Sequence, residues 1–229
     1  VRRQTAFDKI SELKLPLIQR VKLDRWNFGN NDITESLDSS NVPDFTNLGE
    51  NPKLIQVGTT TVFQQLSPDL ANKGVIFTDF YSALEEIPEI IEQYFGTALP
   101  FDEDKLTAYH TAYFNSAAVL YVPDNVEVNV PVEGLFYQDS DEAVPFNKHV
   151  LIIVGKHAKL SYLERFESLG KDSVKNTANI AVEVIALEGA QVKFSAIDRL
   201  GSNLTTFISR RGRLNKNAQI DWNLGVMNE

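Results

Sequence analysis

The sequence predicts a mainly β protein in which a parallel β-helix, or solenoid, follows a smaller mixed α/β N-terminal domain. Two observations predict this fold class. Helical periodicity in the first hundred residues gives way to period-two alternation from about Tyr121 onward. In the second part, one short segment pattern recurs at nearly constant intervals. We place the two domains at residues 1–105 and 106–229, and no Pro/Ser-rich linker separates them.

The N-terminal domain begins with a predicted helix and a polar segment, followed by strands. Phe7, Ile10 and Lys14 lie at helical spacing, and Pro16 ends that pattern. The segment Asn27–Pro52 is rich in Asn, Asp, Ser and Gly, which is typical of a long loop or a series of turns. Short apolar or alternating runs then predict three strands, at residues 54–57, 61–66 and 75–80.

Two further helices are predicted before the solenoid. The first is amphipathic, with apolar positions at Leu84, Ile87, Ile90, Ile91 and Tyr94. Pro88 marks its first turn or a break. Asp102 is a candidate N-cap for the second helix. The inward face of that helix carries Leu106, Tyr109 and Tyr113.

The second part of the chain contains a fourfold repeat. Its copies align without gaps at residues 125–130, 157–162, 189–194 and 217–222, spaced by 32, 32 and 28 residues. The fourth position is aliphatic in each copy: Val128, Leu160, Val192 and Ile220. The sixth position is large and apolar: Val130, Tyr162, Phe194 and Trp222.

This pattern predicts a turn through Gly, Asn or His at the first position of each copy, followed by a strand that buries every second side chain. One such strand cannot cover its apolar face alone, so stacked copies form a continuous interior. Alternation predicts the clearest strands at residues 159–166, 180–187, 192–197 and 220–224, with further strands between them. An antiparallel sandwich or barrel is the alternative, but neither requires a constant interval.

The composition excludes several classes of function. The absence of cysteine excludes disulfides, zinc fingers, thiolate-ligated clusters and a cysteine nucleophile within this chain. With 31 acidic and 22 basic residues, the net charge of −9 opposes binding to nucleic acid and anionic membranes. No phosphate-binding loop, nucleophile elbow or dinucleotide-binding glycine pattern occurs, and we read no secretory signal or membrane span. We expect a cytoplasmic binding or scaffolding role.

The three histidines are weak candidates for a site. His110 lies on a predicted helix beside core tyrosines, where a packing role is the commoner one. His149 opens a strand and His157 occupies a repeat turn. A site using His149 and His157 is conceivable, although two histidines without a third ligand give little support for a metal.

Two charged clusters have simple structural interpretations. The acidic one comprises Asp139, Asp141 and Glu142. It lacks the glycine-aspartate repeat of a calcium loop, which favours a solvated loop. The basic one comprises Arg210, Arg211 and Arg213. Because these three would alternate between the faces of a strand, we interpret them as a solvated rim, with a protein-interface patch as the alternative.

Several stretches of the sequence resemble a known family. They are Leu23–Phe28, Tyr109–Pro123 with its continuation Val126–Pro131, and His149–Gly155 with its continuation Ala158–Glu164. These stretches are similar to the SufB/SufD family of iron–sulfur cluster assembly proteins. The resemblance spans most of the chain and implies a right-handed parallel β-helix after a helix-containing N-terminal domain, which agrees with the repeat.

The resemblance also implies a function. In this family SufB and SufD pair, each binds a SufC ATPase subunit, and the assembly builds nascent iron–sulfur clusters. A separate ATPase chain agrees with the missing phosphate loop. The chain is thus expected to be a noncatalytic cytoplasmic scaffold with SufB-like and SufC-like partners, without nucleic acid or membrane.

One position separates the two branches of the family. In SufB, the strand resembling Ser161–Glu164 is followed by Gly-Cys, and that cysteine is proposed to receive sulfur. Here Arg165 and Phe166 follow instead. Since phenylalanine neither accepts sulfur nor ligates iron, the chain resembles the SufD branch.

Members of the family continue past the position of Glu229, through more coils to a helical part that binds SufC. The residues that bind SufC and face SufB are therefore expected beyond Glu229. We expect no catalytic, cofactor-binding or metal-binding residue in this fragment, and no cofactor of its own, because the complex assembles the cluster.

Two further expectations concern the final coil and the rival functions. Ile220, Trp222 and Leu224 continue the alternation without a polar cap, so we expect the last coil to fray or to be covered by another molecule, such as a second copy. The alternatives in function are a β-helical polysaccharide-active enzyme and a stand-alone structural β-helix.

Overall fold

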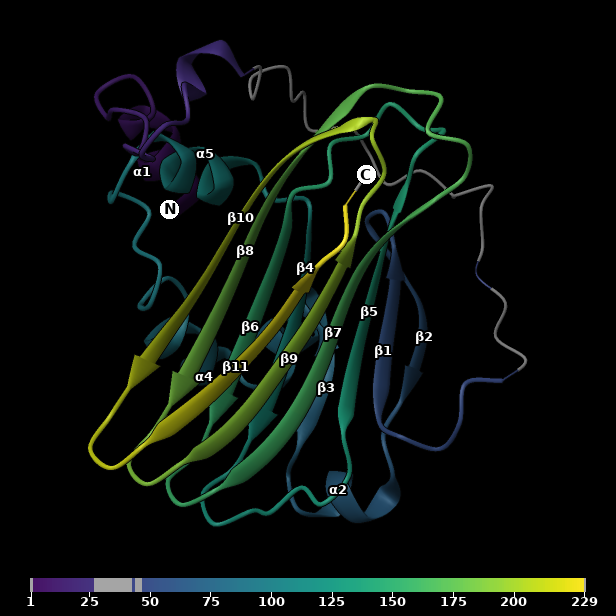
Figure 1. Ribbon diagram of the computed structural model, residues 1–229. Coiled ribbons are helices and arrows are strands. Elements are labelled where there is room, and N and C mark those ends of the chain that lie inside the picture. Colours follow the sequence, from purple (N-terminus) through teal and green to yellow (C-terminus); the bar gives the residue numbers. More distant parts are fainter. Residues whose placement is uncertain (1, 27–42, 44–46, 229) are drawn as a thin grey trace.

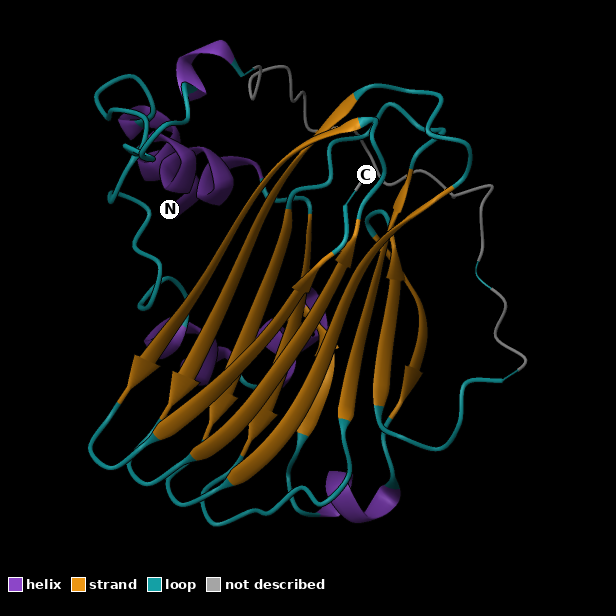
Figure 2. Cartoon of the chain, in the orientation of Figure 1, coloured by secondary structure: helices purple, strands orange, loops and turns teal. Residues whose placement is uncertain are grey.

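The computed structural model describes residues 2–26, 43 and 47–228. Most of the loop expected at Asn27–Pro52, and Phe28 within the resembling N-terminal segment, lie outside the described residues. Within the described part, two sheets face each other and the chain passes alternately between them (Figures 1 and 2). No helix in this part is long and apolar enough to span a membrane.

Each sheet is built mainly from parallel strands whose order follows the passage of the chain. Sheet A has the order β11-β9-β7-β5-β1-β2, with β11 (Gln219–Val226), β9 (Gln191–Arg199), β7 (Lys159–Leu169), β5 (Val132–Asp139), β1 (Lys53–Val57) and β2 (Thr60–Gln65). Sheet B has the order β10-β8-β6-β4-β3, with β10 (Leu204–Leu214), β8 (Asn176–Ala186), β6 (Lys148–Val154), β4 (Ser116–Val122) and β3 (Ile76–Asp79). The predicted parallel β-solenoid is confirmed.

A row of turns at one corner sets the register of the coils. The first residue of every repeat copy has a positive φ: Asn125, His157, Gly189 and Asn217. The backbone N–H groups of the first three donate to carbonyl groups of the next coil. The chain therefore turns in the left-handed conformation at the same place in each coil, as the repeat predicts.

The repeat's fourth positions lie in one interior between the two sheets. Val192 pairs with Leu160 on one side and Ile220 on the other. Val128 joins the same core through the bridge between Glu127 and Lys159. Three of the four side chains are buried and Ile220 is partly buried, so the predicted common interior is confirmed.

The sixth positions form an aromatic ladder, with one correction. The rings of Tyr162 and Phe194 lie 5.4 Å apart, and those of Phe194 and Trp222 lie 4.6 Å apart. Val130, however, is 42% exposed, and Val132 pairs with Tyr162 in its place. Two extra residues in the first copy displace Val130 from the ladder, a local irregularity that gapless alignment cannot detect.

Helices cover the outer face of sheet B. They are α3 (Phe80–Glu86), α4 (Pro88–Tyr94) and α5 (Lys105–Tyr113), and α1 (Arg2–Lys9) packs on α5. The short helix α2 (Pro68–Asn72) follows β2 and contributes Leu70 to the interior core. The helical layer buries apolar residues on the outward side of β4, β6 and β8, including Val119, Leu151 and Ile185. Strand β8 is consequently buried on both faces, and not alternating as predicted.

The predicted helices need several corrections. The first ends at Lys9, well before Pro16, and Phe7 is 51% exposed. The amphipathic segment is two helices that meet at Ile87, with Pro88 in the first turn of α4.

The last of the predicted helices, α5, also differs in its cap and its buried face. Asp104, and not Asp102, caps it in a capping box with Thr107. Its buried face contains Leu106 and His110, whereas Tyr109 and Tyr113 are only half-buried.

Strands of the N-terminal part continue both sheets of the solenoid. β1 pairs in parallel with β5, and β3 pairs antiparallel with β4. The domain division at residues 105 and 106 stays a prediction. At the other end, β10 and β11 are the outermost strands of their sheets, and Leu224 is 52% exposed. Association through this end also stays a prediction.

Candidate functional site

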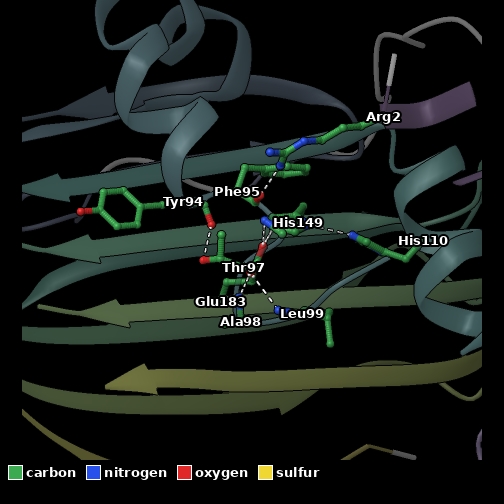
Figure 3. A network of polar contacts seen from close by, with 10 residues as sticks. Arg2, Tyr94, Phe95, Thr97, Ala98, Leu99, His110, His149 and Glu183 are labelled. Atoms are coloured by element: carbon green, nitrogen blue, oxygen red, sulfur yellow. Dashed lines mark hydrogen bonds and ion pairs between the residues drawn. The ribbon is translucent and has the colours of Figure 1, made fainter. Parts of the chain in front are cut away.

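A buried polar network lies between sheet B and its helical cover. His149 on β6 and Glu183 on β8 point outward from the sheet, where the helical layer buries both of them. The His149 Nε2 atom lies 3.0 Å from a carboxylate oxygen of Glu183 (Figure 3). Apolar residues surround this pair, so its polar atoms need partners within the protein.

Glu183 anchors the loop between α4 and α5. Its carboxylate accepts hydrogen bonds from the backbone N–H groups of Gly96, Ala98 and Leu99, at 2.8, 2.8 and 3.0 Å. Gly96 has a φ of +72°, a conformation that favours glycine and brings these amides together around one carboxylate. One buried side chain thereby fixes the start of the α4–α5 loop on the sheet (Figure 3).

His110 extends the network into α5. Its Nε2 lies 3.0 Å from Nδ1 of His149, and its Nδ1 lies 3.0 Å from the carbonyl oxygen of Asn179. The rings of Phe95 and Phe114 enclose His149, with centroids 4.6 and 5.8 Å from the imidazole. The structure therefore brings together residues from α5, β6 and β8 in a largely apolar enclosure.

Burial and hydrogen bonding set the charges of this network. Burial, reinforced by the neighbouring His149 and Arg3, lowers the pKa of His110 well below its ordinary value. Burial alone would raise the pKa of Glu183, but hydrogen bonds from His149, Gly96 and Leu99 outweigh it, and the pKa is lowered. The network thus favours an ionised Glu183 and disfavours a positive charge on His110.

Two arginines of α1 hold the cover in place. Arg2 donates to the carbonyl groups of Glu92 and Phe95 at the end of α4. Arg3 donates to the carbonyl group of Phe114, 2.9 Å away, and its guanidinium lies 4.1 Å from the centre of the Phe114 ring. The last carbonyl groups of a helix lack partners and carry partial negative charge, so these arginines stabilise the C-terminal ends of α4 and α5.

A second buried cluster lies inside the solenoid. Arg210 on β10 crosses the interior and donates to both oxygens of Asp198, at 2.7 and 3.0 Å. It also donates to one oxygen of Glu164, at 3.1 and 3.2 Å. The Tyr162 hydroxyl is also buried, and its interaction with the Glu164 carboxylate opposes the rise in the pKa of Glu164. Burial raises the pKa of Glu164 to about 7, although Arg210 opposes this shift. Arg210 binds both oxygens of Asp198 but only one oxygen of Glu164.

A buried lysine on β6 also lies in the interior. The Lys148 amine donates to the side-chain oxygens of Gln56, 2.7 Å away, and Ser116. It lies 4.9 Å from the centre of the Phe136 ring and 5.7 Å from that of Phe146. Burial lowers the pKa of Lys148 well below its ordinary value. The buried amine therefore finds its hydrogen-bond partners within the protein.

The structure pairs the histidines differently from the sequence interpretation. His149 joins His110, whereas His157 stands in an exposed corner turn and forms no site with His149. The ring of His110 stacks on Phe114 at 5.9 Å, as a packing residue would, but both of its nitrogens also make hydrogen bonds. The sequence pattern gives no indication that Glu183 belongs to a site, because this residue lies within an apolar run whose outward face is buried.

Both charged clusters differ from their predicted environments. Asp139 is buried and accepts a hydrogen bond from the backbone of Asp141, so this acidic segment is only partly solvated. Arg210 is largely buried in the interior, and not at a solvated rim. Arg211 does face solvent, where it pairs with Glu103. Across the described residues, no group of three or more His, Asp or Glu side chains could hold a metal ion.

Phe166 lies in the interior of the solenoid. It is fully buried, and its ring lies 5.5 Å from that of Phe136 and 6.1 Å from that of Phe146. The guanidinium of Arg210 lies 5.6 Å from the ring. An aromatic side chain therefore fills the place where the resemblance puts a sulfur-accepting cysteine in SufB.

The fold defines the chain as a two-sheet parallel β-solenoid protein with a helical cover on one sheet. Two family models match it: "SUF system FeS cluster assembly, SufBD core domain" over residues 136–229, and "SufBD protein N-terminal region" over residues 47–133. The chain belongs to the SufB/SufD family of iron–sulfur cluster assembly proteins.

Curated relatives agree with this assignment. The iron–sulfur cluster assembly protein SufD of Bacillus subtilis is 36% identical over 99% of this chain and 54% of its own length. SufBD family proteins of Staphylococcus saprophyticus and Staphylococcus aureus are 28% and 25% identical, over 74% and 96% of this chain. They are covered over 37% and 47% of their own lengths, so the chain spans about half or less of these relatives.

Proposed function

We propose that this chain is part of a noncatalytic scaffold subunit of the SUF machinery that pairs with a SufB-like protein and a SufC-like ATPase in the cytoplasm. The observation that carries this proposal is the likeness to SufD over nearly the whole chain. Phe166 in the solenoid interior, together with the absence of cysteine, supports a SufD role over a SufB role. A chain without thiolates has no side chain suited to receive persulfide sulfur.

Affinity purification from the native organism tests the partners. The full-length protein that contains this sequence is tagged at its chromosomal locus and recovered from cytosolic extract. We expect a SufC-like ATPase and a SufB-like protein in stoichiometric amounts. A matched control carries the same tag on an unrelated cytosolic protein of similar acidity, since a net charge of −9 can attract basic proteins nonspecifically. Recovery without either partner would contradict the scaffold proposal.

A reconstitution experiment tests whether the cluster is a product of the complex and not a resident group of this chain. The 229-residue chain is incubated anaerobically with ferrous iron and sulfide, desalted, and examined by absorbance spectroscopy. We expect no retained cluster and no ATP hydrolysis, because the chain supplies neither thiolates nor a phosphate-binding loop. A stoichiometric cluster that survives desalting would refute this part of the proposal.

The rival function, a β-helical polysaccharide-active enzyme, makes a different prediction. Such an enzyme needs carboxylates and a base on an accessible sheet face. In this solenoid Glu164, Asp198 and Glu183 are all buried, and the first two are paired with Arg210. Release of reducing ends from a panel of acidic and neutral polysaccharides would favour the rival, and we expect none.

A further inference from the structure

The hydrogen bonds around His110 and His149 determine how many protons this pair holds. The network ends at an acceptor on both sides: the Asn179 carbonyl oxygen and the Glu183 carboxylate. Between these ends, the four ring nitrogens make three contacts of 3.0 Å each, and every contact requires a proton. Two neutral imidazoles carry only two ring protons, so one contact would join two acceptors. Three protons complete the network.

We propose that His110 and His149 share one proton beyond their neutral forms, and that this proton fastens α5 and the loop at residues 95–99 to sheet B. The positive charge resides on His149, which donates one N–H to His110 and the other to Glu183. His110 then donates its single N–H to the Asn179 carbonyl group. The cover of sheet B is thereby a proton-dependent latch, with donors from α5, β6 and the loop converging on β8.

The charges facing the pair agree with one added proton and exclude a second. On β8 stands the Glu183 carboxylate, whose charge the imidazolium of His149 balances. On α1 stand Arg3, which opposes a charge on His110, and Arg2, which is bound to the Phe95 carbonyl group. A balanced ion pair is tolerated in an apolar enclosure, whereas an isolated charge is not.

Loss of the shared proton has a defined structural consequence. The contact between His110 Nε2 and His149 Nδ1 would join two lone pairs, and Glu183 would lose its cationic partner. The hydrogen bond between His110 and His149 is then lost, whereas the bonds that join α5 to Asn179 on β8 remain. The loop amides on Glu183 are held in a site with an uncompensated charge. Protection of those amides should therefore fall as the pH rises and the proton leaves.

Nitrogen NMR of the 229-residue chain labelled at histidine tests the proton count directly. The chain has three histidines, and exposed His157 serves as the reference ring in the same spectrum. At about pH 7, where a free imidazole is mostly neutral, we expect one ring protonated at both nitrogens and one protonated only at Nδ1. Two neutral rings in the folded protein would overturn the proposal, whatever the behaviour of any variant.

Hydrogen exchange tests whether the proton fastens the cover. The opening equilibria of the Gly96, Ala98 and Leu99 amides are measured as the pH is raised from about 6 to about 9, after correction for intrinsic exchange. We expect them to increase about tenfold, the effect of about one lost hydrogen bond, in step with the change in the histidine spectrum. Amides of β9 report the opening of the solenoid interior over the same pH range, and the increase at the loop amides should exceed theirs.

Variants then separate the latch from a general loss of stability. Glu183→Gln removes the counter-charge and should leave two neutral rings at about pH 7. Glu85→Gln on the exposed side of α3 makes the same charge change away from the network and should leave the spectrum unaltered. Loop amides whose protection is independent of pH, while the histidine pair titrates, would show that the proton does not fasten the cover.

Discussion

Glu164 offers a direct test of how the solenoid interior handles charge. Its carboxylate is fully buried, and one oxygen accepts hydrogen bonds from Arg210. Burial raises its pKa from 4.5 to about 7, even though Arg210 opposes the shift. We expect Glu164→Gln to leave the protein equally stable or more stable at about pH 8, because the neutral amide keeps an oxygen for Arg210 and carries no buried charge.

The magnitude follows from linkage between protonation and folding. The folded state binds a proton at Glu164 at pH values where the unfolded chain has already lost it, so this group's contribution is present below pH 4.5 and is lost as the pH rises through about 7. One pKa unit corresponds to about 1.4 kcal/mol, which makes the full loss about 3 kcal/mol as an order of magnitude. Asp198 keeps both of its contacts with Arg210 and limits secondary changes.

Urea unfolding of the wild-type chain and of Glu164→Gln, measured from about pH 4.5 to about 8, gives the required comparison. The difference between the two free energies of unfolding should change by about 3 kcal/mol in favour of the variant as the pH rises. Glu167→Gln on the same strand, at a half-buried position, is the matched control and should not reproduce the change. A pH-independent difference between wild type and Glu164→Gln would refute the assignment of a proton to this carboxyl.

Three further predictions follow from particular contacts. Leu160→Ala should lower the free energy of unfolding by about 2–5 kcal/mol, because the side chain is buried between the sheets, and a denaturant-measured loss below about 0.5 kcal/mol would contradict its position. Gly189→Ala should cost about 1–3 kcal/mol in the same assay, because φ is +69° and the added methyl group meets the His157 ring; the cost should shrink in a His157→Ala background. His110 should make the free energy of unfolding decrease as the pH is lowered below about 6.5, because its pKa is lowered in the folded protein and only the unfolded chain takes up the proton there. A His110→Gln variant that keeps the full pH dependence would count against this reasoning.

The solenoid could be predicted from the sequence because its signal is local. A positive-φ residue followed by alternating apolar positions encodes one turn and one strand, and Leu160, Val192 and Ile220 repeat that unit in register. The position of Val130 could not be predicted in the same way, because two inserted residues preserve the apolar character of the segment while changing which side chain faces inward.

The buried polar clusters could not be predicted because their partners are distant in the sequence. Arg210 meets Glu164 and Asp198 across the interior, and a basic run without those partners is ordinarily exposed. Glu183 stands in a strand whose outward face is covered by helices, so alternation gives no sign that it is buried. The signal available was a carboxylate within an apolar run, which favours burial with a specific partner.

The two buried clusters respond to pH in different ways because each resolves a different imbalance of charge. Inside the solenoid, two carboxylates face one guanidinium, and Glu164 removes the excess negative charge by taking up a proton. Under the helical cover, one carboxylate faces two imidazoles, and the inferred single proton on the histidine pair supplies the missing positive charge. In both places a proton replaces a counter-ion that the fold does not supply, so the interior core and the cover of sheet B should lose stability together as the pH rises. Comparison of Glu164→Gln with Glu183→Gln separates the two contributions. Glu164→Gln should remove its share of the pH dependence of global unfolding and leave the histidine spectrum unchanged, whereas Glu183→Gln should change the histidine spectrum.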